Sequence, residues 1–114
     1  MMQEQKLLLK IEGHMAIIEK YSGKCADITS FIESESLRST CILHILLVGE
    51  LMKGFSSEFR KSHDDVPWAD IIGLRDIIAH RYGDIQFERV WEIIQETIPM
   101  LAEWLKKIKR NDKD

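Results

Sequence analysis

The sequence contains few residues that interrupt helices, with only two prolines and six glycines among 114 residues. Its branched apolar residues recur at steps of three and four rather than alternating, which is typical of helices and not of strands. Apolar residues make up 45% and charged residues 31%, a balance that excludes an intrinsically disordered chain. We therefore predict an all-α protein, and the length fits a single domain over residues 1–114.

The sequence also lacks the features of secreted, membrane and metal-binding proteins. Its two cysteines, Cys25 and Cys41, form no CxxC pair, and residues 1–10 do not resemble a secretory signal. We expect buried, reduced thiols in a cytoplasmic protein. The longest apolar run, Cys41–Val48, is too short to span a bilayer. Because there is no HExxH motif, no spaced carboxylate set and no glycine-rich loop, we predict neither a metal site nor a cofactor.

The sequence also lacks an excess of positive charge. It has 16 Lys and Arg residues and 19 Asp and Glu residues, which gives a net charge of −3. A protein that holds long stretches of duplex usually has a basic surface, because phosphate contacts supply most of the non-specific affinity. Any chemistry on nucleic acid must therefore depend on a local cluster or on a cleft shared between subunits.

The apolar spacing predicts a bundle of four or five helices. A first helix carries Leu8 to Ile18 and fades near Ser22, and the polar stretch 24–36 holds a short turn or helix. A second stripe, more than twenty residues long, runs from Leu37 to Phe59, and its middle is apolar all round. Such a helix is buried on several sides, so we expect it to be central and to contact a partner subunit.

Two further helices are expected in the second half of the chain. The third begins at Pro67, since a first turn needs no amide hydrogen there, and stops near Gly83, a suitable C-cap. The fourth runs from Phe87 to Ile108 and should be kinked or split at Pro99.

The end of the third helix is the one place where ionisable residues crowd an apolar element. Asp76 and His80 lie one turn apart on the same face, whereas Arg75 and His80 are splayed by about a third of a turn. An imidazole can transfer protons near neutral pH, and a guanidinium binds phosphate oxygens. Asp76 could fix the imidazole tautomer or form an inert ion pair with Arg75. On spacing alone, a structural ion pair at a helix end is the commoner arrangement.

Other polar residues have simpler interpretations. His44 lies in the apolar run and is expected to be a core histidine, whereas His14 and His63 are expected at the surface. Trp68, Trp91 and Trp104 are spaced as packing residues. Glu50 is either a buried acid tied to Arg75 or His80, or an exposed edge residue.

Several motifs in order resemble the HEPN superfamily and, within it, the HepT toxins. Arg75-x(4)-His80-x-Tyr82 resembles the HepT motif, and Val48-Gly49-Glu50 resembles the family's Ile-Gly-Glu. The segment 66–76 resembles its Pro-Trp-x-x-Ile-x-Gly-Met/Leu-Arg-Asn/Asp block, and 87–91 resembles the start of its last helix. The resemblance covers roughly residues 37–101, and it favours Glu50 as a buried acid that supports the site.

The resemblance implies a homodimer in which two such motifs face each other across a two-fold axis. Arg75 and His80 would be the catalytic pair of a metal-independent endoribonuclease, with Asp76 beside them. Arg81 would either assist RNA binding or face solvent. The partner would be a minimal nucleotidyltransferase, the antitoxin of a toxin–antitoxin pair, which adenylylates Tyr82. The alternative is a non-catalytic HEPN-like dimer that binds a nucleotide or a loop of that partner.

Overall fold

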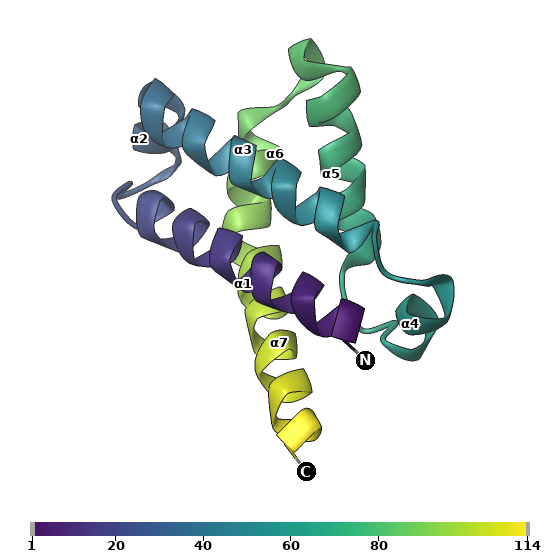
Figure 1. Ribbon diagram of the computed structural model, residues 1–114. Helices are drawn as coiled ribbons and strands as arrows, with labels where there is room; N and C mark the ends of the chain where they lie inside the picture. The colour runs from purple at the N-terminus through teal and green to yellow at the C-terminus, as the bar shows by residue number, and fades with distance from the viewer. Residues whose placement is uncertain (1, 114) are drawn as a thin grey trace.

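The computed structural model describes the backbone of residues 2–113 and the side chains of residues 3–108, and every element in this range is helical (Figure 1). The elements are α1 (Met2–Ser22), α2 (Ile28–Glu33), α3 (Glu35–Met52), α4 (Ser57–Ser62), α5 (Trp68–His80), the 3₁₀ turn η1 (Tyr82–Asp84), α6 (Phe87–Glu92), the π turn η2 (Ile93–Thr97) and α7 (Ile98–Lys113). The predicted all-α fold is confirmed.

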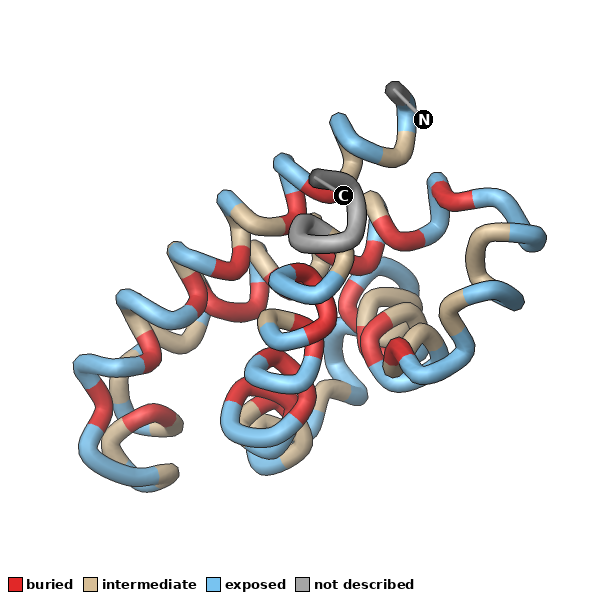
Figure 2. Tube along the Cα trace, turned by 90° about the horizontal axis from the view of Figure 1, so that it is seen from below, coloured by how far each residue is buried: buried red, intermediate tan, exposed pale blue. Residues whose placement is uncertain are grey.

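The long helices form a bundle around one hydrophobic core. α1 and α3 lie side by side and run in opposite directions, α5 packs on α3, and the continuous rod α6–η2–α7 crosses the bundle (Figure 1). Buried and exposed residues alternate along each long helix, as amphipathic helices require (Figure 2). The centre of the core is made of fully buried side chains from every layer: Ile11, Ile18, Phe31, Cys41, Ile45, Val48, Met52, Ile71, Val90, Ile93, Ile98 and Leu101.

The predicted stripe from Leu37 to Phe59 is wrong as a single helix. α3 begins at the cap Ser34, whose hydroxyl accepts a hydrogen bond from the amide of Leu37, and it ends at Met52. After a turn, Ser56 caps α4 by accepting a hydrogen bond from Phe59 N at 3.0 Å. A serine hydroxyl that binds the backbone favours the start of a helix over its interior, which explains the interruption.

Gly83 is not the C-cap of the third helix, so that prediction is wrong too. α5 ends at His80, and the cap is Arg81, whose amide donates to the carbonyl of Ile77 at 2.8 Å. Gly83 lies within η1, and no described glycine has a positive φ. The chain leaves α5 through a residue at φ −142°, so the turn needs no left-handed residue.

Pro99 does interrupt the last helix, as predicted. The interruption is the π turn η2, in which the amide of Ile98 donates to the carbonyl of Ile93, one residue further back than in an α-helix. A proline lacks an amide hydrogen, and its ring would collide with the carbonyl four residues earlier. The wider turn just before Pro99 therefore allows the helix to continue into α7.

The expectations for sulfur and for the aromatic residues are confirmed. Cys25 and Cys41 are buried free thiols, and burial raises the pKa of Cys41 to about 11. Trp104 is buried, while Trp68 and Trp91 pack against the core. Among the described residues, no helix is both long and apolar enough to cross a membrane.

Candidate active site

A glycine brings two helices together at the site. α5 passes α3 at Gly49, where an added Cβ would lie 2.8 Å from Arg75 Cγ and closer still to Arg75 Cβ. Contacts between carbon atoms are optimal near 3.5–4.0 Å, so no larger residue fits at this position without movement. The close approach sets the base of the Arg75 side chain against α3, one residue away from Glu50.

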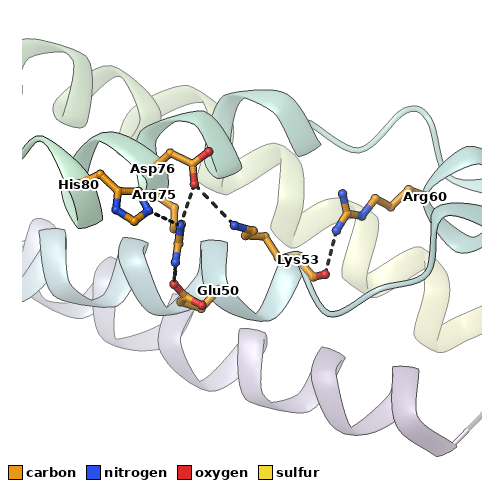
Figure 3. Close-up of polar contacts among 6 residues, drawn as sticks. All are labelled: Glu50, Lys53, Arg60, Arg75, Asp76 and His80. Carbon is orange, nitrogen blue, oxygen red and sulfur yellow. Dashed lines mark hydrogen bonds and ion pairs between the residues drawn. The ribbon is translucent and has the colours of Figure 1, made fainter.

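Arg75 is held on two sides by carboxylates (Figure 3). Its Nε and Nη2 atoms both donate to Glu50 Oε1, and its Nη1 atom donates to Asp76 Oδ1 at 2.8 Å. Only 12% of the Arg75 side chain is exposed. The hydrogen bonds to Asp76 and then to Glu50 raise the pKa of Arg75, so the guanidinium keeps its charge.

His80 lies beside this guanidinium, contrary to the predicted splay. Its Nε2 atom is 3.5 Å from Arg75 Nη1, because the long arginine side chain reaches along α5. An arginine N–H can donate only to an unprotonated nitrogen, so this contact requires a neutral ring with its proton on Nδ1. His80 is exposed, so solvent or a ligand can reach the imidazole.

Asp76 forms an ion pair with Arg75; no hydrogen bond joins it to His80 in the described structure. Its Oδ1 atom also lies 3.8 Å from Lys53 Nζ, at the end of α3. The hydrogen bond from Arg75, aided by the charge of Lys53, lowers the pKa of Asp76. Of the two roles left open by the sequence, the structure contains the ion pair and not the contact that would fix the imidazole tautomer.

Glu50 has the predicted partner but not the predicted burial. It binds Arg75, yet 46% of its side chain is exposed. Lys53 was missed by sequence reasoning, because its place beside Asp76 follows from the packing of α3 on α5. The only local signal was that Glu50 and Lys53 are three residues apart and therefore near each other on α3.

The two remaining candidates follow His80 directly. Arg81 is exposed and lines a groove of about 440 Å³ between α5 and α6, which also contains Asp76, Ile77 and Arg89. Tyr82 begins η1, and it is 57% exposed. Both side chains therefore lie on the surface beside the Arg75–His80 cluster.

The other histidines lie apart from this cluster. His14 was expected at the surface, but it is half-buried between α1 and α3, and its Nδ1 lies 2.9 Å from His44 Nδ1. Burial, and then the neighbouring His44, lower the pKa of His14. His63 is also half-buried and packs against Trp104, so the surface expectation is wrong for both residues. Among the described residues, no group of three or more His, Cys, Asp or Glu side chains could hold a metal ion.

Comparison with known proteins gives a consistent set of relatives. The family model described as "Ribonuclease HepT-like" matches residues 11–108. "Putative RNase TTE0752" of Caldanaerobacter subterraneus is 31% identical over 97 residues, which cover 85% of each chain. "Putative RNase MJ1380" of Methanocaldococcus jannaschii is 31% identical over 68% of this chain and 72% of the relative. "Probable ribonuclease HepT" of Thermococcus cleftensis is 22% identical over 82% of this chain and 84% of the relative. No solved structure matches.

Proposed function

The chain belongs to the HepT-like ribonuclease family, and we propose that it is a metal-independent endoribonuclease that acts as the toxin of a toxin–antitoxin pair. One observation carries the catalytic part of this proposal. Arg75 and His80 lie 3.5 Å apart on one helix, and Glu50 fixes the orientation of the guanidinium. A phosphate-binding group therefore lies in contact with a proton-transfer group that solvent can reach.

The chemistry that fits this pair is transfer of the phosphodiester to the neighbouring ribose oxygen. The 2′-oxygen of RNA attacks the adjacent phosphorus and loses its proton to a base, and the bond to the 5′-oxygen breaks as that oxygen gains a proton. His80 is the group for proton transfer, and Arg75 stabilises the charge that builds up on the phosphate oxygens. The products are a 2′,3′-cyclic phosphate and a 5′-hydroxyl end.

A second copy of the chain would complete this centre. The reaction needs a base and an acid, whereas one protomer offers a single imidazole at the cluster, since His14, His44 and His63 lie elsewhere. We propose a homodimer that brings two clusters together. In support, the large apolar side chain of Leu43 is 49% exposed on α3, seven residues before Glu50 and so on the same face of the helix, where a partner subunit could cover it.

Control by a nucleotidyltransferase antitoxin is the last part of the proposal. Tyr82 carries an exposed phenol two residues after His80. Attack of its oxygen on the α-phosphorus of ATP would release pyrophosphate and leave AMP on the tyrosine. The added phosphate would place an anion next to Arg75 and His80 and would compete with RNA for them.

RNA cleavage without added metal tests the enzymatic proposal. We expect the purified protein to cut single-stranded RNA in the presence of EDTA and to leave cyclic phosphate ends, and H80A and R75A to lose this activity. His80 is exposed, so the stability of H80A should change by no more than about 0.5 kcal/mol, which circular dichroism can check. A folded protein that binds RNA and leaves it intact would favour the non-catalytic alternative.

The antitoxin proposal has a separate test. When the chain is produced together with its proposed nucleotidyltransferase antitoxin, intact mass should increase by one or more AMP units. The added mass should disappear in Y82F, which lacks the acceptor oxygen. An unchanged mass for the wild-type protein, or modification of Y82F, would contradict the assignment of Tyr82.

A further inference from the structure

A row of cations continues from the Arg75–His80 cluster along the end of α3 towards α4. Figure 3 shows His80, Arg75, Lys53 and Arg60 following one another in this order. Three contacts link Arg75, Lys53 and Arg60, because Asp76 bridges Arg75 and Lys53, and the backbone of Lys53 accepts a hydrogen bond from Arg60. The sequence motifs account for His80 and Arg75 but for neither Lys53 nor Arg60.

Lys53 and Arg75 already share one anion. Asp76 Oδ1 lies 2.8 Å from Arg75 Nη1 and 3.8 Å from Lys53 Nζ, so a single carboxylate oxygen separates the two cations. A phosphate oxygen has the same charge and a similar hydrogen-bonding capacity, so the pair can hold a phosphate in the same way. The ion pair of Lys53 with Asp76 is about half exposed on both sides, and such pairs are weak enough to exchange.

Arg60 adds a cation with no acid attached to it. Its Nη2 atom donates to the carbonyl of Lys53 at 2.9 Å, and its guanidinium lies 5.9 Å from the ring centre of Trp68. Within the described part of the chain no carboxylate pairs with Arg60. Its Nε atom is buried and has no hydrogen-bond partner, so a phosphate would be bound through the outer nitrogens of the guanidinium.

A groove of about 410 Å³ lies at this end of the row, and its lining includes the cations Arg60 and Lys61, the carboxylates Asp64 and Asp70, and the ring of Trp68. Trp68 is seven residues before Arg75 on α5, which places both on one face of the helix, two turns or about 10 Å apart. An aromatic ring beside cations is the combination that binds single-stranded nucleic acid, since bases stack on the ring while the backbone contacts the charges.

We propose that Lys53 and Arg60 bind phosphates of single-stranded RNA on one side of the bond that is cut, with the adjoining base against Trp68. This binding track, defined as Lys53, Arg60 and Trp68, rests on the proposed function and names how its substrate is held. A single strand fits better than a duplex, because a chain with a net charge of −3 offers no broad basic face for a duplex. In a dimer, two such tracks would lead away from one central cleft.

The test is binding of fluorescent single-stranded RNA to the full chain as salt is varied, with H80A in every protein to prevent cleavage. Each phosphate contact on a single strand contributes about 0.7 to the slope of log affinity against log salt. K53Q and R60Q should each lower the slope by about that amount and weaken binding roughly 3- to 10-fold. R60K should keep the slope, because it keeps the charge. K20Q is the matched control, since Lys20 lies in the last turn of α1, and among the described residues its ammonium group contacts only the Tyr21 ring.

Cleavage by proteins that keep His80 separates this proposal from the proposed function. R60Q should slow the cleavage of a longer RNA more than that of a dinucleotide, because a dinucleotide is too short to reach Arg60. K53Q should slow the cleavage of both substrates, because Lys53 lies beside Arg75. If the wild-type chain cleaves RNA, and K53Q and R60Q cleave both substrates at the same rates as K20Q, the proposed binding track is wrong. If nothing is cleaved but K53Q and R60Q still lower the salt slope, the enzymatic proposal fails and the track stands.

Discussion

Replacing Gly49 with alanine adds a single methyl group, and this group should displace Arg75 at the centre of the site. The new Cβ would lie 2.8 Å from Arg75 Cγ, and 3.4 Å from the carbonyl oxygen of Ile71. To restore ordinary carbon contacts, α3 and α5 must separate by about 1 Å. Overpacking of this kind costs about 1–3 kcal/mol. Against it stands a gain of about 1 kcal/mol, because alanine favours a helix more than glycine does.

Gly13 provides the matched control for this substitution. It lies exposed within α1, and a Cβ there would meet nothing within 4 Å. G13A should therefore show the helix gain alone, and raise the melting temperature by about 4 °C for 1 kcal/mol in a domain of this size. The difference in melting temperature between G13A and G49A measures the packing cost alone. It should amount to about 4–12 °C.

Activity should follow the same displacement. A shift of about 1 Å in a catalytic group can lower a rate about a hundredfold. We therefore expect G49A to cleave RNA at least tenfold more slowly than the wild-type chain, while G13A keeps full activity. The reasoning would be refuted if G49A were stabilised as much as G13A, or if it cleaved RNA at the wild-type rate while remaining folded.

Three further predictions follow from single contacts. E50Q should lower RNA cleavage at least tenfold without changing the fold, because Arg75 loses the carboxylate that orients two of its nitrogens; equal rates in E50Q and the wild-type chain would contradict this role. Burial raises the pKa of Cys41 to about 11, so this thiol should resist iodoacetamide at pH 8 until the chain is unfolded in urea. Peptide mass mapping can follow the labelling, and rapid labelling of the native protein would disprove the assigned burial. Folding lowers the pKa of His14, so the unfolded chain binds more protons than the folded chain. The free energy of unfolding should therefore fall as the pH decreases through about 6.5 towards the pKa of His14 in the folded state. Urea midpoints at pH 7.5 and pH 5.5 measure this loss, which should be smaller in H14Q, and an equal loss in H14Q would rule out His14 as its cause.

The sequence predicted those parts of the fold and site that depend on neighbours along one helix. Arg75, Asp76 and His80 were expected together at the end of one helix, and they are. The ion pair of Asp76 with Arg75 was one of two predicted alternatives. The contact of Arg75 with His80 was not predicted, because the spacing of Cα atoms on a helix does not reveal how far an arginine side chain extends. The contact of Lys53 with Asp76 and the pairing of His14 with His44 join different helices, so they depend on packing that no local pattern contains.

Helix ends were the weaker part of the prediction, for a related reason. The apolar spacing from Leu37 to Phe59 is continuous, and apolar spacing alone cannot distinguish one long helix from two helices that bury the same side. Ser56, a good cap, was the local signal for the break between α3 and α4. At the end of α5, Gly83 suggested a cap, yet Arg81 turned the chain two residues earlier in a conformation that any residue can adopt.

The acidic balance of the chain and the pairing of Arg75 have a common consequence for RNA binding. Glu50 and Asp76 carry two negative charges against the one positive charge of Arg75, so Lys53 brings this cluster to neutrality and Arg60 adds the next positive charge along the row. Glu50 accepts from the Nε and Nη2 atoms, and the Nη1 atom, which faces His80, donates to the half-exposed Asp76. An incoming phosphate must therefore displace Asp76 while Glu50 keeps the guanidinium in place. Affinity gained along the binding track would favour that exchange, and short RNA without track contacts would have to make it unaided.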